Sequence, residues 1–186
     1  MNKTLKTVQV VIIGGGCAGL SLGSRLAKAP KAPTTIIIEP RVEYTEDRTW
    51  CFWDTENLFE EISAEKWQRA WFKNENFSNK LELFPYSYKM IRSTDFYKLM
   101  FNTILQHKNI EIFQDEVLDF SELGHHCVVQ TKTKPFTCNQ IFNSIYNPKF
   151  VKSQTKFPLV QQHFVGWFII SKEAVFTEDC PTFMDF

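Results

Sequence analysis

The alternation of apolar and polar residues over the first forty positions predicts a strand, a helix and a second strand. Residues 8–13 form an apolar, mostly β-branched run, as expected of a buried strand. Apolar residues then recur at helical spacing over residues 17–28, and Pro30 and Pro33 end that helix. A second apolar run covers residues 34–38. This order is typical of a β-α-β unit with parallel strands.

The turn between the first strand and the helix carries the spacing G-x-G-x-x-G at Gly14, Gly16 and Gly19. Gly14 permits a tight turn, Gly16 has no side chain to block a phosphate, and Gly19 lets the helix pack close to the strand. The free N–H groups of the helix N-terminus then favour an anion. The second strand closes with Glu39, twenty positions beyond Gly19. An acid there binds ribose in dinucleotide folds, and it favours FAD or NAD over NADP. The alternative is a tight glycine turn in an ordinary β-α-β unit.

The middle of the chain predicts a mixture of elements. Residues 40–54 show no regular period and are expected to form a connection. Residues 60–72 are expected to be helical, with Trp67 and Trp71 on one apolar face. Residues 77–91 predict a hairpin or antiparallel strands around Pro85. Ser93 or Thr94 is expected to cap a helix that runs to about residue 107, with five apolar residues facing inward: Phe96, Leu99, Met100, Ile104 and Leu105.

Beyond this helix the pattern changes to short strands. Residues 109–113 predict a third parallel strand. Three runs separated by polar turns, at residues 116–120, 126–131 and 136–145, predict an inserted antiparallel meander. A polar link is expected over 150–158, one long strand over 160–170 and another strand over 182–186.

The expected connection after Glu39 faces the ligand crevice, because loops at the carboxyl ends of parallel strands lie there. Arg48 is therefore a candidate for a phosphate or carboxylate, and Trp50 and Trp53 are candidates for a cofactor or substrate wall. The alternative is a surface ion pair between Asp47 and Arg48 with two core tryptophans.

Composition limits the classes of function. The 186 residues carry 21 basic and 21 acidic side chains, so no net charge steers nucleic acid to the protein. Five scattered cysteines without a C-x-x-C pair indicate free thiols in a reducing cytoplasm. No apolar run has the length of a membrane span. The aromatic content of 15% suits a core, and it also suits a long apolar groove.

Histidines and cysteines do not form a recognisable metal site. The spacing of His125, His126, Cys127 and Cys138 fits no common zinc pattern, and a hairpin edge explains these residues. His163 lies among apolar neighbours, which indicates a hydrogen-bonded core histidine. We therefore expect no metal.

Several stretches together resemble the bacterial lycopene cyclases. They are Gly14–Leu22, Asp47–Trp53, Tyr88–Ile91, Phe96–Tyr97, Phe142–Ser144, Gln161–Trp167 and Phe183–Phe186. The resemblance implies an α/β fold: a Rossmann-like FAD-binding parallel sheet, an inserted antiparallel β-meander and a partial antiparallel-sheet substrate domain. It assigns residues 1–54 and 92–150 to FAD binding, and residues 55–91 and 151–186 to the substrate-binding part.

The resemblance also implies an activity, the conversion of the ends of lycopene to β-ionone rings without net redox change. An acid protonates the terminal double bond, a neighbouring double bond attacks the tertiary cation, and a ring proton leaves. Reduced FAD is required in this family, and aromatic walls suit the cation. The free thiols predict a cytoplasmic protein. Because a polyene substrate resides in lipid, the resemblance adds peripheral contact with the inner face of the membrane as an expectation.

Carried over by position, the resemblance gives a set of cofactor-binding residues. Gly14, Gly15, Gly16, Gly19 and Glu39 form the ADP-binding set, Arg41 and Arg48 face ribose or phosphate, and Val117 holds adenine through its backbone. The catalytic acid stays unassigned. Family members continue well past the point equivalent to Phe186, and only Gly23, Gly124 and Gly166 follow Gly19. We therefore expect an N-terminal portion, incomplete at its C-terminus and inactive alone, with a separately encoded C-terminal half as one candidate partner.

Two other functions share the first glycine motif. One is a redox flavoenzyme of the same architecture, either a monooxygenase or a protein like the geranylgeranyl reductases. The other is a non-catalytic nucleotide-binding fragment. The Trp50–Trp53 and Gln161–Trp167 stretches favour the cyclase over the redox flavoenzyme, whereas the expected truncation favours the non-catalytic fragment.

Overall fold

The computed structural model describes residues 6–153, 156, 158, 160, 165–173 and 180–185. It divides into two compact units. Unit 1 comprises Met1–Thr49 and Arg92–Ile145, and unit 2 comprises Trp50–Ile91 and Tyr146–Phe186. The boundaries therefore fall at 49/50, 91/92 and 145/146, against expected positions of 54/55, 91/92 and 150/151.

Unit 1 contains two sheets and two helices. Its elements are β1 (Lys6–Thr7), β2 (Val10–Ile13), α1 (Cys17–Ala27), β3 (Thr35–Ile38), α2 (Ser93–Leu105), β9 (Ile110–Phe113), β10 (Val117–Leu123), β11 (His126–Thr131), β12 (Phe136–Cys138) and β13 (Gln140–Asn143). One sheet has the order β13-β2-β3-β9, and all its strands are parallel. The other has the order β1-β12-β11-β10, in which β10, β11 and β12 form the antiparallel meander.

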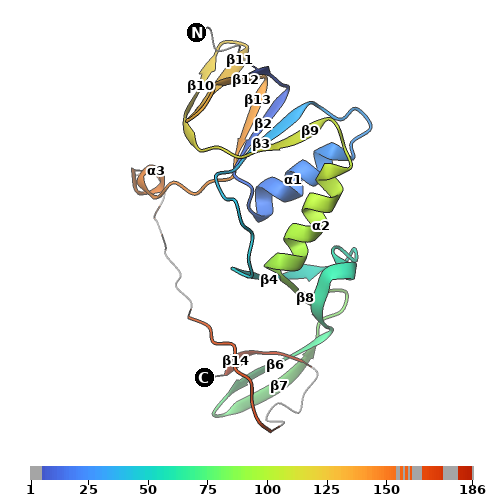
Figure 1. Cartoon of the computed structure of the whole chain (residues 1–186). Helices are drawn as coiled ribbons and strands as arrows, with labels where there is room; N and C mark the ends of the chain where they lie inside the picture. The colour runs from blue at the N-terminus through green and yellow to red at the C-terminus, as the bar shows by residue number, and fades with distance from the viewer. Residues whose placement is uncertain are drawn as a thin grey trace. The chain divides into compact units, whose positions relative to one another are not determined.

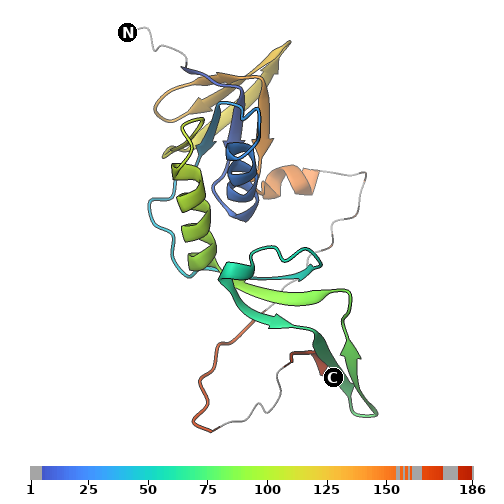
Figure 2. The same ribbon diagram turned by 90° about the vertical axis from the view of Figure 1, so that its right-hand side faces the viewer.

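The two central strands of the parallel sheet, β2 and β3, are buried on both faces. Helices α1 and α2 lie side by side on one face of the sheet (Figure 1, Figure 2). The other face contributes alternate strand residues, such as Val11 and Ile36, to a core shared with Phe136 and Val129 of the meander sheet. Because both faces of β2 and β3 are covered, these strands read as nearly continuous apolar runs, which is why they were predictable from the sequence. The edge strand β9 keeps three apolar residues around the exposed Glu111.

Unit 2 is built of short strands. Its elements are β4 (Thr49–Asp54, beginning at the last residue of unit 1), a 3₁₀ turn η1 (Glu60–Ile62), β5 (Ser63–Trp67), β6 (Arg69–Asn74), β7 (Phe77–Glu82), β8 (Ser87–Arg92), α3 (Pro148–Ser153) and β14 (Thr182–Asp185). One sheet has the order β4-β8-β5 and the other β14-β6-β7. Strands β6 and β7 pair antiparallel, whereas β14 adds to β6 in parallel.

The helix expected over residues 60–72 is wrong. Strands β5 and β6 occupy this stretch and belong to different sheets, so the four-residue spacing of Trp67 and Trp71 does not place them on a shared face. The expected loop over 40–54 is also wrong beyond Thr49, where β4 begins. Tertiary pairing with β8 stabilises β4 although its sequence lacks a strand period.

Four further expectations need correction. Residues 136–145 are two strands, because the chain leaves the meander sheet at Asn139 and continues as β13 in the parallel sheet. Leu105 is 78% exposed and does not face inward. The polar link begins as helix α3. In the stretch 160–170 the described residues Val160 and 165–170 lie in no helix or strand, since no described strand offers them backbone partners, and 161–164 lie outside the described residues.

Candidate dinucleotide site

The turn between β2 and α1 has the backbone geometry that its glycines allow. Gly14 has φ +99°, which side-chain-bearing residues rarely adopt, and its N–H donates to the Ile38 carbonyl at 2.9 Å. A Cβ built on Gly16 would meet no atom within 4 Å. Gly16 precedes the first residue of α1, and no side chain caps this helix. The N-terminus of α1 is therefore uncapped next to open space at Gly16, an arrangement that suits an anion.

Gly19 allows a close approach between helix and turn. A Cβ there would lie 1.9 Å from the Gly14 carbonyl oxygen, so any side chain would push α1 away from the turn. One helical turn further on, a Cβ on Gly23 would lie 2.5 Å from Cδ1 of Ile37 on β3. The glycines thus hold α1 tightly against the strands.

Glu39 sits directly beside this turn, at the end of β3, and is only 6% exposed. Its Oε2 accepts the N–H of Gly15 at 2.5 Å, and its Oε1 accepts the backbone N–H and Nε of Arg41, both at 3.0 Å. Burial acts to raise the pKa of Glu39, but the hydrogen bonds from Arg41 and Gly15 lower it below its usual value. The carboxylate is therefore ionised near neutral pH.

Arg41 is directed at protein groups on several sides. Its Nη2 donates to the Gly15 carbonyl at 2.9 Å, its Nη1 donates to the Tyr97 hydroxyl at 3.5 Å, and its guanidinium lies 4.5 Å from the ring centre of Tyr44. The Tyr44 hydroxyl is buried and has no hydrogen-bond partner among the described residues. Burial and the charge of Glu39 raise the pKa of Tyr44 to about 12.

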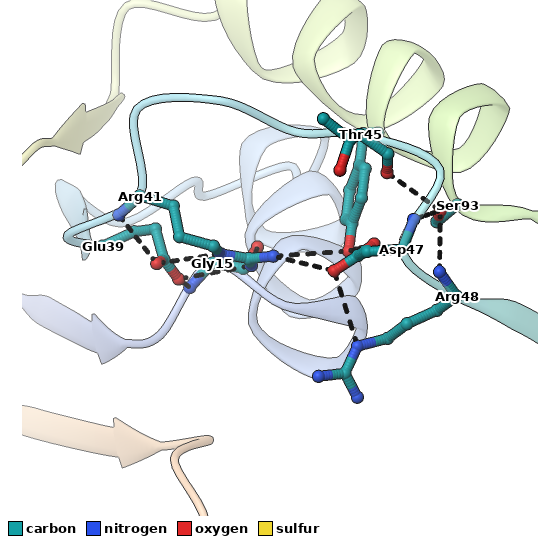
Figure 3. A network of polar contacts seen from close by, with 8 residues as sticks. Gly15, Glu39, Arg41, Thr45, Asp47, Arg48 and Ser93 are labelled. Carbon is teal, nitrogen blue, oxygen red and sulfur yellow. Dashed lines mark hydrogen bonds and ion pairs between the residues drawn. The ribbon is translucent and has the colours of Figure 1, made fainter.

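The loop that follows Arg41 passes next to Ser93 at the start of α2 before the chain enters β4 (Figure 3). Asp47 Oδ2 lies 3.7 Å from both Arg41 Nη1 and Arg48 Nε. The side chain of Arg48 is 67% exposed and forms with Asp47 the ion pair that the sequence left open as an alternative. Among the described residues, Arg48 is linked to the turn through Asp47 and Arg41.

Val117, the residue expected to hold adenine, lies at the start of β10 and packs against the core around Phe136.

Trp53, a candidate for a cofactor or substrate wall, belongs to unit 2, where it contacts Tyr88 at 4.8 Å and Phe183 at 5.5 Å between ring centres. The structure thus brings Gly14, Gly15, Gly16, Gly19, Glu39 and Arg41 together at one turn. Whether these residues hold a cofactor stays a prediction.

Three residues of this site escaped the sequence analysis: Tyr44, Ser93 and Tyr97. Ser93 was expected to cap α2, but the structure shows no side-chain cap there, and its hydroxyl bonds the loop 45–48 instead. The i, i+4 spacing of Ser93 and Tyr97 on a helix was the available signal that they share a face. Nothing in the sequence indicates that Tyr44 packs on Arg41.

No group of three or more metal-ligating side chains occurs in the part of the chain that the structure describes. Cys127 and Cys138 face each other across β11 and β12 as free thiols. His163 lies outside the described residues. Of the described helices, none has the length and apolarity needed to cross a bilayer.

Solved structures with this fold include flavin-dependent enzymes. The p-nitrophenol 4-monooxygenase PnpA from Pseudomonas putida DLL-E4 matches with a TM-score of 0.64 and 14% identity, over 82% of this chain and 44% of that chain. PqsL, a probable FAD-dependent monooxygenase from Pseudomonas aeruginosa, matches with a TM-score of 0.58 and 13% identity, over 73% and 42%. Halogenase PltM in complex with phloroglucinol and FAD matches with 0.54 and 16%, over 74% and 34%. The chain therefore has a mixed α/β fold of this class and spans less than half of each solved chain.

A family model gives the more specific assignment. The model described as lycopene cyclase protein matches residues 9–186, nearly the whole chain. The chain belongs to the lycopene cyclase family, as its sequence motifs predicted. A comparison with curated protein sequences gives no match.

Proposed function

We propose that this chain is the N-terminal, FAD-binding part of a lycopene cyclase, with a Rossmann-like parallel sheet as its nucleotide-binding core. The observation that carries the proposal is the joining of Glu39 to the glycine turn by the 2.5 Å hydrogen bond from Gly15. An ionised acid next to an open, uncapped helix N-terminus suits an adenosine ribose and a diphosphate together. The membership of the chain in the cyclase family then selects the reaction.

The residues fit FAD on grounds of geometry and charge. The open space at Gly16 and the free amides of α1 would hold the diphosphate, and Glu39 would accept hydrogen bonds from ribose hydroxyls. The guanidinium of Arg41 is already paired with Glu39. A cofactor with an additional phosphate on its ribose, such as NADP, would therefore place that phosphate next to a carboxylate without a free cation to bind it. When bound, reduced FAD supplies an electron-rich ring system that stabilises positive charge on a polyene.

The substrate part of the proposal concerns lycopene and its conversion to β-ionone rings by net isomerisation. Unit 2 supports it with ring contacts among Trp53, Tyr88 and Phe183, because aromatic faces stabilise cations. A peripheral membrane contact and a separately encoded C-terminal partner belong to the same proposal.

FAD binding by the purified chain tests the proposal. We expect flavin fluorescence titration to show saturable binding, and both Gly16→Val and Glu39→Gln to weaken it by about tenfold or more. The valine would fill the open space proposed for the diphosphate, and the glutamine would remove the negative charge that accepts the ribose hydroxyls. Gly166→Ala is the matched control, because Gly166 also has nothing within 4 Å of a Cβ but lies in unit 2. Equal affinity in the wild type and both site variants would overturn the proposal.

A redox flavoenzyme is the second candidate, because the solved neighbours include monooxygenases. NADPH consumption by the FAD-loaded chain would favour that function. Ring formation from lycopene without NADPH consumption, measured by chromatography of the extracted polyene, would favour the cyclase.

A further inference from the structure

We propose that Ser93 and Tyr97 of α2 are positioning residues for Glu39. They act through the loop that carries Arg41, to which their hydroxyls are hydrogen-bonded. The proposal rests on the proposed nucleotide site and deepens it, because it assigns the control of that site to a helix that the glycine motif does not include.

The hydroxyl of Ser93 uses its full hydrogen-bonding capacity on one loop. It accepts the N–H groups of Asp47 at 3.0 Å and Arg48 at 3.2 Å, and it donates to the Thr45 carbonyl at 3.1 Å. The backbone N–H of Ser93 donates to the Arg48 carbonyl at 3.0 Å. Ser93 is fully buried, so water cannot replace these bonds. Ser93 therefore fixes the backbone of residues 45–48 (Figure 3).

Tyr97 fixes the side chain of Asp47 in the same loop. It lies one helical turn after Ser93, is 2% exposed, and donates its O–H to Asp47 Oδ1 at 3.1 Å. The other oxygen of Asp47 lies 3.7 Å from Arg41 Nη1, and Nη1 itself donates to the Tyr97 oxygen at 3.5 Å. Asp47 and Tyr97 together thus hold Nη1 of the Arg41 guanidinium.

The other two nitrogens of the Arg41 guanidinium, Nε and Nη2, contact the nucleotide site itself. Nε donates to Glu39 Oε1 and Nη2 to the Gly15 carbonyl, so a planar guanidinium held at Nη1 also fixes the carboxylate and the turn. The contacts run from α2 through Asp47 and Arg41 to Glu39 without a break. Loss of the hydroxyl of either Ser93 or Tyr97 should therefore make Glu39 more mobile, although the effect reaches Glu39 only through Asp47 and Arg41.

Hydrogen exchange of the ligand-free protein tests the linkage without any cofactor. In Ser93→Ala, peptides covering residues 10–20 and 36–48 should exchange at least several-fold faster than in the wild type. Thr94→Val is the matched control, because the Thr94 hydroxyl bonds the exposed side chain of Glu46, whereas the Ser93 hydroxyl bonds the backbone of the loop. Faster exchange confined to residues 45–48, with the turn unchanged, would overturn the proposal. Tyr97→Phe gives a second, milder variant that keeps the ring in place.

The pH dependence of FAD affinity separates positioning from general loosening. The groups that face Glu39 are Arg41, the neutral Tyr44 and the backbone of Gly15. If Arg41 is released, Glu39 loses the bonds that lower its pKa, so affinity should begin to fall at a higher pH in Ser93→Ala and Tyr97→Phe than in the wild type or Thr94→Val. At neutral pH we expect about tenfold and threefold weaker binding, respectively.

The two proposals fail in different ways. A wild-type chain that binds no FAD would refute the proposed function, while the exchange comparison would still decide the role of α2. Wild-type binding with identical pH profiles in Ser93→Ala, Tyr97→Phe and Thr94→Val would refute the positioning role alone.

Discussion

Asp115 holds together the connection between β9 and β10 with a single carboxylate. It is 7% exposed and accepts the hydroxyls of Thr131 and Thr133, the Thr133 N–H, and the N–H of Glu116. Burial acts to raise its pKa, but these hydrogen bonds lower it to about 2. The residue therefore links the connection after β9 to the turn between β11 and β12, and it does so most strongly when it is ionised.

This carboxylate predicts an acid-sensitive step in stability. The unfolded chain binds a proton at Asp115 near its ordinary pKa, about 3.9, whereas the folded chain resists protonation until about pH 2. Lowering the pH through this window therefore favours unfolding. Asp115→Asn should remove about 2 kcal/mol of stability at neutral pH and flatten the loss between pH 4 and 2. Urea unfolding at several pH values measures the stability at neutral pH and its loss in acid. If Asp115→Asn and the wild type lost stability equally between pH 4 and 2, the role of the Asp115 carboxylate would be contradicted.

Gly19 predicts a fold defect that Gly16 does not. A methyl group at Gly19 would overlap the Gly14 carbonyl, so Gly19→Ala should cost about 2 kcal/mol or more of stability. Gly16→Ala meets open space and should leave the thermal midpoint within a few degrees of the wild type. Calorimetry of the two variants makes the comparison, and equal midpoints would show that the helix moves freely away from the turn.

At the scale of elements, α1 and β3 are fitted to each other at Gly23. A Cβ at Gly23 would lie 2.5 Å from Cδ1 of Ile37 and 3.2 Å from Cδ1 of Ile110. Gly23→Ala should gain about 1 kcal/mol of helix propensity and lose about 1–3 kcal/mol to overpacking. Adding Ile37→Val removes the obstructing methyl, so the double variant should be more stable than the additive sum. A double-mutant cycle by urea denaturation measures this coupling, and additivity would refute the fit.

In unit 2 a buried ion cluster joins β8 to the segment that follows β4. Lys89 is fully buried and contacts Asp54 Oδ2 at 2.9 Å, the Leu58 carbonyl at 3.1 Å and the carboxylate of Glu60. Lys89→Met should cost about 3 kcal/mol, because Asp54 would stay buried without its cation. Lys66→Met is the control: Lys66 bonds the other oxygen of Glu60 but is partly exposed, so its loss should cost less than about 1 kcal/mol. Similar losses in the two variants would contradict the role of burial.

Elements with a strong local signal were predictable, and elements that depend on distant partners were not. The apolar runs of β2 and β3 and the glycines between them indicated the β-α-β unit, the glycine turn of the candidate site and the acid at Glu39. The helix expected at Trp67 was wrong because its two tryptophans lie on strands of different sheets. Ser93 was misread because a serine at the start of a helix bonds either the helix or a distant loop, and local sequence does not distinguish these.

At the scale of the whole molecule, two parallel chain segments change sheets together. β1 pairs with β12 in the meander sheet, and β2 pairs with β13 in the parallel sheet, so the step occurs at Gln9 in one segment and Asn139 in the other. The N–H groups of Asn139 and Gln140 both donate to the Gln9 carbonyl, at 3.0 and 3.1 Å. The amide of Gln9 in turn donates to the Thr34 carbonyl at 3.0 Å, which joins β3 to the same point.

This shared step has a consequence for the order in which the protein is made. On the ribosome, β2, α1 and β3 emerge early and can form their local contacts, but the strand that covers the second edge of β2 ends at Asn143. Until translation has passed that residue, one edge of the central strand stays open to other nascent chains. Between the synthesis of β2 and that of β13 we therefore expect the growing polypeptide to expose a strand edge that favours aggregation.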